Sequence, residues 1–354
     1  MRITIVLPFL RLTGGSRVLV DLANGLAARG HAVTGIVPVR LKRLPAGLGR
    51  IEWLWRAPAM RRKYRWFTPR FELRIVPELD VGAIPPGDIV MASAWQTAEL
   101  VAACPPGCGA RAYLVQDVET HEQPERAGAT YRLPLAKIAT SDWIARELEE
   151  HWGAKVDAVV PLGLDLAQLP GKPRPPRPAR RFGMLYGTHP RKGFSDGLAA
   201  FEEARRSAPG LELLVLGRVK TPPSLPPYAK GRWNVDPAQV ASVYGEADAW
   251  IGPSRSEGWG LPPMEAMAMG CAVVTTRVGG TPYFAENEVT ALVVEPGDVA
   301  GLARALSRLA TDGELVGRLS EAGFARARQL CFETTVRGVE EALARLTGGP
   351  RPGA

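Results

Sequence analysis

The sequence predicts an α/β protein built from two doubly wound domains, each a parallel sheet covered by helices. Its 354 residues are enough for two domains of ordinary size. Short apolar and β-branched runs alternate along the chain with helical segments, which is the order of repeated βαβ units. A proline- and arginine-rich stretch, residues 170–178, interrupts this alternation near the middle of the chain. Its stiff composition is typical of a linker, and we expect the domain boundary there.

The composition indicates the broad class of protein to which this chain belongs. Apolar residues make up 46% of the chain and charged residues 23%, as in soluble globular proteins. No apolar run approaches the ~18 residues of a membrane-spanning helix. The apolar residues 3–10 are too few for a signal peptide and lack a cleavage site, so we expect a strand there and a cytoplasmic protein. Cys104 and Cys108 have no second pair or histidine cluster that would complete a zinc site.

The first domain begins with a βαβ unit. Strand 3–10 is followed by a loop containing Gly14 and Gly15, and a helix then runs to Ala28. A glycine pair at the first turn is typical of phosphate-binding α/β domains, although any tight turn also favours glycine. Further elements follow in order: strands at 31–37, 88–92, 112–115 and 137–140, a helix at 142–151, and a strand at 156–160.

The second domain begins with strand 182–186, and a turn carrying Arg191 and Lys192 leads into a helix at 194–207. Cations at a strand-to-helix turn can neutralise a diphosphate, but they are also ordinary surface residues in a basic protein. A strand at 211–216 then precedes Gly217 and Arg218, and a short helix spans 240–247.

Residues 254–270 form the most informative stretch, and they predict a loop and a helix between two strands. Pro262 and Pro263 suit a first helical turn, and Gly270 suits its end. Glycines before the helix allow a ligand to approach the backbone, and the helix N-terminus favours a phosphate. Glu257 and Glu265 lie in the loop and in the first turn, where either could accept sugar hydroxyls or simply favour the helix dipole.

The run SRSEGWGLPPMEAMAMGCAVVTTRVGG resembles the E-x7-E signature of glycosyltransferase family 4, whose members are retaining enzymes. Similarity to the family extends over most of the chain and is strongest from 182 to 300. It implies the GT-B fold, with two Rossmann-like domains facing a deep cleft. The domains would be 1–169 on the acceptor side and 182–330 on the donor side, joined by linker 170–181. Helix 331–347 would cross back to the first domain, and 348–354 would be a disordered tail.

The resemblance also implies roles for individual residues. Glu265 would hold the ribose of a nucleotide sugar, and Glu257 its sugar. Lys192 and Arg191 would stabilise the departing diphosphate, although Thr188 stands roughly where the family has its separate arginine. Other positions would contact the donor: Gly258, Trp259, Gly260, Leu261, Gly14, Gly15, Gly187, Thr188, Gly217 and Arg218.

The chain departs from the family pattern at the residue after the strand that ends near Val115. The family usually has a histidine close to the transferred sugar, whereas this chain has Gln116. Glutamine can bind a sugar hydroxyl but cannot act as a base near neutral pH. Gln116 therefore joins the catalytic candidates, and the nearby His121 is the alternative.

Positive charge concentrates in residues 40–70, which hold ten Arg or Lys and one acid, Glu52, in a chain of net charge +8. Three tryptophans accompany them. One interpretation is that residues 50–70 contact an anionic acceptor or a membrane surface. A solvated basic loop is equally consistent, and nucleic acid is the interpretation we do not expect.

The expected function is therefore transfer of a sugar from a nucleotide-diphosphate sugar to a hydroxyl of a sugar, lipid-linked or small-molecule acceptor. The expected location is the cytoplasm, with membrane association on the inner face. No Asp-x-Asp is present, so we expect neither a metal nor a cofactor. Two alternatives remain: a sugar-nucleotide epimerase of GT-B fold, and a non-catalytic sugar-nucleotide-binding protein. The base, the sugar and the acceptor do not follow from the sequence.

Overall fold

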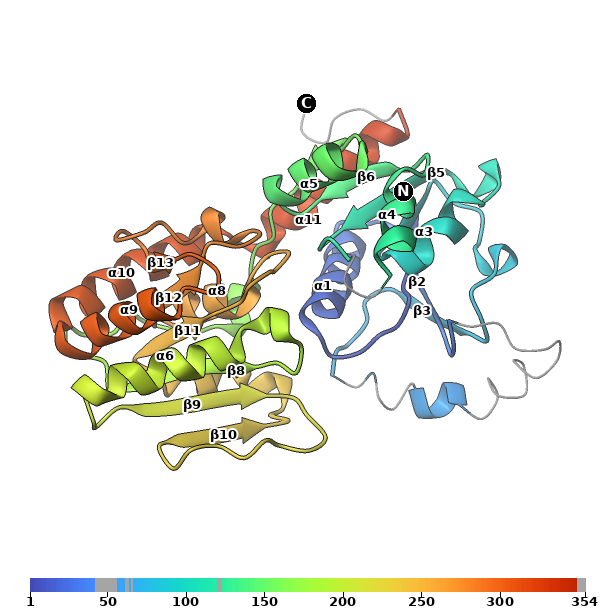
Figure 1. Ribbon diagram of the computed structural model, residues 1–354. Helices are drawn as coiled ribbons and strands as arrows, with labels where there is room; N and C mark the ends of the chain where they lie inside the picture. The colour runs from blue at the N-terminus through green and yellow to red at the C-terminus, as the bar shows by residue number, and fades with distance from the viewer. Residues whose placement is uncertain (42–55, 61–63, 65, 120–122, 349–354) are drawn as a thin grey trace. The chain divides into compact units, whose positions relative to one another are not determined.

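The computed structural model describes residues 1–41, 56–60, 64, 66–119 and 123–348. The chain divides into two compact units, one holding Met1–Pro161 and the chain from Glu333 onward, the other Leu162–Phe332 (Figure 1). Residues 50–55, 61–63 and 65 of the basic segment, His121 and the tail beyond residue 348 lie outside the described residues, and the expectations about the segment, the histidine and the tail stay predictions.

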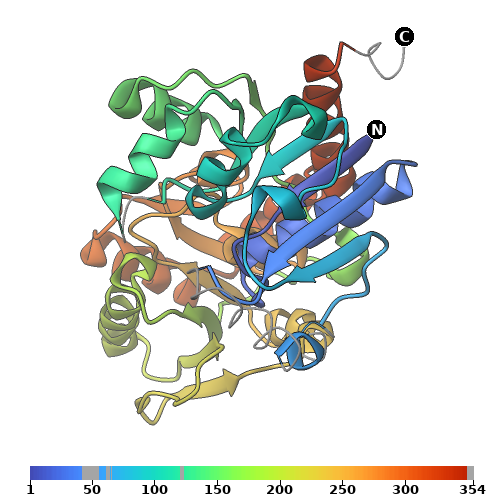
Figure 2. The ribbon, with the colours of Figure 1, turned by 90° about the vertical axis from the view of Figure 1, so that its right-hand side faces the viewer.

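The first unit contains a seven-stranded parallel sheet in the order β3-β2-β1-β4-β5-β6-β7. The order reverses between β1 and β4, and in such sheets ligands bind beyond the carboxyl ends of the strands at this point. Figure 2 shows β2 and β3 side by side at one edge. The strands are β1 (Arg2–Val6), β2 (Ala32–Pro38), β3 (Glu72–Val76), β4 (Ile89–Ala92), β5 (Ala110–Val115), β6 (Ala136–Ala139) and β7 (Ala158–Val159).

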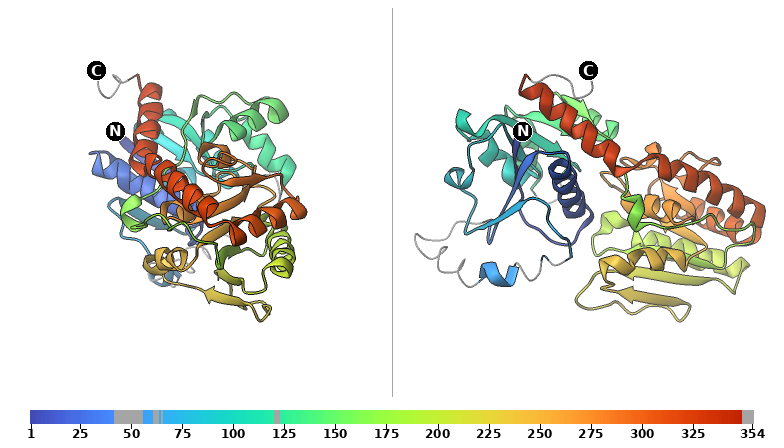
Figure 3. Two further views of the ribbon diagram at one scale, coloured as in Figure 1. Left: turned by 90° about the vertical axis from the view of Figure 1, so that its left-hand side faces the viewer. Right: turned by 180° about the vertical axis from the view of Figure 1, so that it is seen from behind.

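Five helices of eight or more residues lie in the described part of the first unit. Buried apolar side chains of α3, α4 and α5 share one core with alternate residues of the strands. The last helix, α11, packs beside α1 (Figure 3), since a Cβ on Gly25 would lie 2.5 Å from Val336. The helices are α1 (Gly14–Ala28), α3 (Trp95–Ala102), α4 (Pro124–Tyr131), α5 (Asp142–Trp152) and α11 (Phe332–Leu346), with 3-10 turns η1 (Val81–Ala83) and η2 (Pro106–Cys108).

The second unit contains a six-stranded parallel sheet in the order β10-β9-β8-β11-β12-β13, which reverses between β8 and β11. Its core joins both halves of the sheet to α6, α9 and α10. The strands are β8 (Arg181–Tyr186), β9 (Glu212–Gly217), β10 (Ala229–Trp233), β11 (Ala249–Gly252), β12 (Ala272–Thr276) and β13 (Leu292–Val294). The helices are α6 (Phe194–Ser207), α7 (Val240–Gly245), α8 (Leu261–Ala268), α9 (Val299–Thr311) and α10 (Gly313–Gln329), with turns η3 (Leu166–Gln168), η4 (Pro190–Lys192), η5 (Pro237–Gln239) and η6 (Thr281–Tyr283).

The expectation that segment 170–181 is a linker is wrong in the structure, because this segment packs on the second unit. The backbone N–H of Arg174 donates to Ser320 Oγ at 2.7 Å, and its guanidinium donates to the carbonyls of Ala247 and Tyr244. Gly171 lies so close to α8 that an added Cβ would be 2.3 Å from Met269 Cα. The chain changes unit at 161–162 and again at 332–333 instead.

Among the residues that the structure describes, no helix combines the length and the apolar character needed to cross a membrane. The same residues contain no group of three or more His, Cys, Asp or Glu side chains placed to hold a metal ion.

Candidate active site

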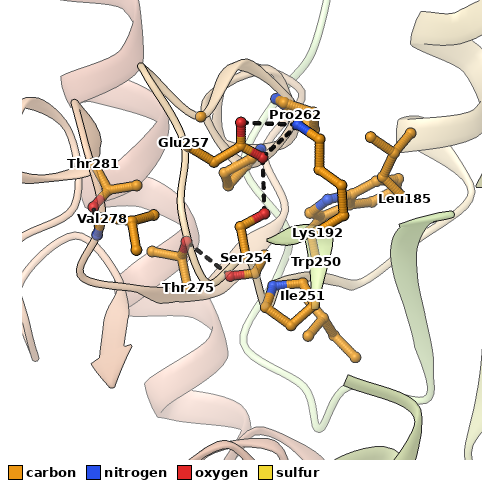
Figure 4. A pocket seen from close by; sticks show the side chains of 14 residues that line it. Leu185, Lys192, Trp250, Ile251, Ser254, Glu257, Pro262, Thr275, Val278 and Thr281 are labelled. Carbon is orange, nitrogen blue, oxygen red and sulfur yellow. Dashed lines mark hydrogen bonds and ion pairs between the residues drawn. The ribbon is translucent and has the colours of Figure 1, made fainter. Parts of the chain in front are cut away.

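A pocket in the second unit lies where the strand order reverses, beyond the carboxyl ends of β8 and β11 (Figure 4). Its walls come from β8, η4, β11, the loop after β11, the start of α8 and β12. Leu185, Ile251 and Val278 are among its apolar side chains. Its polar and charged side chains include Lys192, Ser254, Glu257, Thr275 and Thr281. The pocket therefore combines one cation and one carboxylate at the edge of the sheet where a ligand is expected.

Lys192 and Glu257 face each other across this pocket (Figure 4). The ammonium Nζ donates to both carboxylate oxygens, at 2.7 and 2.8 Å, and Ser254 Oγ donates to Oε1 at 2.8 Å. The side chains are 26% and 14% exposed, so the pair is partly shielded from water. Gly187 is absent from the lining of this pocket, and an added Cβ there would lie 2.6 Å from Lys192 Cγ. Gly187 thus leaves room for the lysine side chain.

A second ion pair fixes the loop of Lys192 to the loop of Glu257. Arg255 donates two hydrogen bonds to the carboxylate of Asp196, at 2.7 and 2.8 Å, and its backbone N–H donates to the Arg191 carbonyl at 2.7 Å. Asp196 lies in the first turn of α6 and its side chain is 8% exposed. Neither Arg191 nor the exposed Thr188 lines the pocket. Lys192 is therefore the positively charged side chain among the residues that line it.

The loop before α8 ends at Gly260, which has φ of +96° and forms the N-cap of the helix. Pro262 and Pro263 occupy the first turn and carry no N–H, so Leu261 is the amide donor left among the first three helical residues. The expected phosphate contact with amides 258–261 therefore relies on the loop and on Leu261 rather than on the helix as a whole.

Trp259 and Glu265 are both buried, and the donor contacts expected of the Trp259 backbone amide and of Glu265 stay predictions. The Trp259 indole N–H donates to Met264 Sδ at 3.2 Å, and its ring packs on Tyr283. Glu265 is 5% exposed and accepts a hydrogen bond from the Tyr244 hydroxyl at 2.6 Å. Neither residue lines the pocket, because the motif turns their side chains into the domain.

Gly217 is the last residue of β9, next to β8, and Arg218 follows it; both lie outside the pocket lining. The carbonyl of Gly217 accepts from the backbone N–H of Asn234, and the Arg218 guanidinium donates to the Val235 carbonyl at 3.2 Å. They hold the chain after β10 to the end of β9, and a contact with a nucleotide base stays a prediction.

The first unit has its own cluster at the carboxyl edge of its sheet. Gly14 and Gly15 open α1, whose N-cap Thr13 accepts from the backbone N–H of Ser16. The Oε1 atom of Gln116 lies 3.7 Å from where a Cβ on Gly15 would be, and it is buried with no hydrogen-bond partner among the residues that the structure describes. The structure thus brings the predicted glycine pair and Gln116 together. His121 lies outside the described residues.

Several residues of the site were missed by sequence reasoning. Ser254, Tyr244, Asp196 and Arg255 hold the charged groups in place. Ser254 and Arg255 lie within the motif and could have been considered. Tyr244 and Asp196 are distant in sequence from the glutamate or arginine they contact, and no local pattern marks them.

The comparisons with known proteins agree with this geometry. The family model of Glycosyl transferases group 1 matches residues 181–312. A D-inositol 3-phosphate glycosyltransferase of Segniliparus rotundus is 31% identical over 237 residues, covering 60% of this chain and 53% of that protein. A glycogen synthase of Mycobacterium tuberculosis is 30% identical over 46% of this chain and 42% of its own. The chain thus spans about half the length of the curated relatives that it matches.

Solved structures of similar fold cover the whole chain. HepE of Anabaena in complex with UDP aligns with a TM-score of 0.75 and 15% identity over 98% of this chain and 100% of that one. Sucrose-phosphate synthase of Thermosynechococcus elongatus aligns with a TM-score of 0.72 and 18% identity over 98% and 99%. Residues 181–312 of the second unit thus resemble the group 1 glycosyltransferases, and the chain has the GT-B fold of two Rossmann-like domains.

Proposed function

We propose that this protein is a retaining glycosyltransferase that moves a sugar from a nucleotide-diphosphate sugar to an acceptor hydroxyl. The observation that carries the proposal is the Lys192 ammonium, held 2.7 Å from Glu257 in a pocket at the carboxyl edge of the second sheet. Both residues lie within the region that matches the glycosyltransferase family. A cation and a carboxylate at this edge suit a diphosphate and the hydroxyls of a sugar.

The chemistry requires stabilisation of a leaving group that gains negative charge. As the bond between the sugar C1 and the diphosphate oxygen breaks, Lys192 and the Leu261 amide would neutralise the oxygens of the departing diphosphate. The acceptor oxygen bonds to C1 on the same face, and its proton passes to the leaving phosphate oxygen. Glu257 is paired with Lys192 and Ser254, which argues against its use as a nucleophile. Glu265 is assigned to the ribose.

The substrates are proposed from the chemistry of the relatives. HepE was crystallised with UDP-glucose, so a uridine donor is the first to test, followed by guanosine donors. A relative is named for D-inositol 3-phosphate, which suggests a polar, phosphorylated acceptor for this chain as well. We also propose that the reaction needs no metal and that it takes place in the cytoplasm, where residues 50–70 contact an anionic acceptor or membrane.

Two other functions make different predictions. An epimerase would convert a sugar nucleotide without any acceptor. A non-catalytic binding protein would bind the donor and release no nucleotide with any acceptor, and the replacement of a histidine by Gln116 is the observation that favours it.

The test has two stages on the full chain. Thermal unfolding is first measured with UDP-glucose, UDP-N-acetylglucosamine, GDP-mannose and ADP-glucose. A ligand at a hundredfold excess over its dissociation constant should stabilise the protein by about 2.7 kcal/mol. The donor that stabilises is then incubated with inositol phosphates and with lipid-linked sugars, and nucleotide release and anomeric configuration are measured. Sugar conversion without an acceptor would identify an epimerase, and binding without turnover would identify a binding protein.

A further inference from the structure

The ion pair between Lys192 and Glu257 affects which ligands can bind to Lys192. The cation that is proposed to hold the diphosphate is neutralised by a carboxylate, with both oxygens within 2.8 Å of Nζ. Ser254 donates a further hydrogen bond to the same carboxylate, but its hydroxyl carries no charge that could replace the ammonium group. A ligand that takes Lys192 must therefore leave Glu257 with a compensating partner, because a shielded carboxylate without one is unfavourable.

Two ligands differ in whether they supply that partner. A nucleotide sugar brings phosphates for Lys192 and sugar hydroxyls that donate to Glu257. A nucleoside diphosphate brings the phosphates alone, so it competes with Glu257 for Lys192 and places like charge beside the carboxylate. We propose that Glu257 forms its ion pair with Lys192 again once the sugar has been transferred. This ion pair weakens the binding of the nucleoside diphosphate product, which is then released. This proposal rests on the proposed function. It adds that the site distinguishes the nucleotide sugar from the nucleoside diphosphate product.

The alternative is a purely structural glutamate that holds its loop. Glutamine has nearly the same shape as glutamate and can still accept from Ser254, so a structural role predicts that Glu257→Gln binds both ligands as the unchanged protein does. The proposal predicts an unequal effect. Removal of the charge should raise the affinity for the nucleoside diphosphate by about tenfold, the scale of relieving one like-charge contact. The affinity for the nucleotide sugar should not rise.

The experiment is calorimetric titration of the full chain with UDP and UDP-glucose, and with GDP and GDP-mannose. Glu257→Gln is compared with Glu257→Asp, which keeps the charge and should leave UDP or GDP affinity close to that of the unchanged protein. Glu203→Gln is the matched control, since it removes one carboxylate from an exposed pair with Arg206 near the opposite end of α6. Thermal unfolding of each variant verifies that it is folded.

The outcomes separate the two proposals. Selective tightening of the nucleoside diphosphate in Glu257→Gln, with stronger product inhibition during turnover, supports the inference. Equal changes for both ligands, or weaker binding of the nucleoside diphosphate, overturns it while the proposed function stands. If the unchanged protein binds none of the four ligands, the proposed function fails and this inference fails with it.

Discussion

Replacement of Tyr244 by phenylalanine removes one hydroxyl from a buried contact with Glu265. The hydroxyl donates at 2.6 Å, Tyr244 is 1% exposed and Glu265 is 5% exposed, so water does not replace the lost bond readily. A hydrogen bond to a charged group contributes about 1.5–3 kcal/mol. For a unit the size of Leu162–Phe332, we expect the melting temperature to fall by roughly 3–12 °C. Nucleotide affinity should fall as well, because the ribose contact proposed for Glu265 depends on a carboxylate that Tyr244 helps to hold in place.

The same chemical change can be made at a surface contact of the same unit. Tyr228 donates to Glu202 at 2.7 Å in exposed surroundings, so Tyr228→Phe should change the free energy of unfolding by less than about 1 kcal/mol and leave nucleotide affinity unchanged. Calorimetry and thermal unfolding of the two variants are compared side by side. Equal melting temperatures would refute the claim that burial gives the Tyr244 contact its strength. A lower melting temperature with full nucleotide affinity would refute the link from Tyr244 to the ribose.

Four further predictions follow from the charged groups. Lys192→Met should lower turnover by on the order of a hundredfold, as for loss of one charge-stabilising group, and an effect confined to KM would contradict this. Excess EDTA should leave transfer unchanged; loss of activity that magnesium restores would show that a metal is needed. Cosedimentation with anionic vesicles should exceed that with neutral ones at low salt and fade at 1 M, where the screening length is ~3 Å; equal binding would exclude a role for residues 50–70. Burial alone would raise the pKa of Glu340, but hydrogen bonds from His31 and Arg29 outweigh it, and the pKa lies below its ordinary 4.5. The stability from this carboxylate is therefore present above pH 4.5 and is lost as the pH falls through the lowered value, so the difference in unfolding free energy between Glu340→Gln and the unchanged protein should be largest at neutral pH and narrow in acid.

The elements that sequence reasoning predicted are those with strong local signals. Helices α5 and α6 begin where they were expected, because Ser141 caps the first and Gly193 precedes the second. The edge strands β3 and β10 were missed, since ELRIV and AKGRW are short and carry charged residues, as exposed edges often do. Strand β1 ends at Val6 rather than at residue 10, two residues before a proline that lacks the N–H of a ladder bond.

The charged pair of the site could be predicted as two separate residues, and its assembly could not. Glu257 belongs to a motif and Lys192 to a turn, but nothing in either segment indicates that they contact each other. The place of the Trp259 side chain could not be predicted either, because the motif assigns only the backbone amide of this residue to the donor. Its indole is buried and packs on Tyr283.

The distance between Lys192 and Glu257 is set by backbone packing more than by their attraction. Gly193, at φ of +62°, lies so close to the end of β11 that an added Cβ would be 1.9 Å from the Pro253 carbonyl oxygen. Gly279 stands equally close to the carbonyl oxygen of Glu257. The Gly193 contact brings together the loops after β8 and β11, and the bond from the Arg255 N–H to the Arg191 carbonyl joins these loops directly. The Gly279 contact holds the loop after β12 against the loop that carries Glu257. None of them involves the carboxylate of Glu257. Loss of that charge should therefore leave Lys192 where it is and change only what the lysine can bind, so an altered ligand affinity in Glu257→Gln reports on electrostatics rather than on a collapsed site.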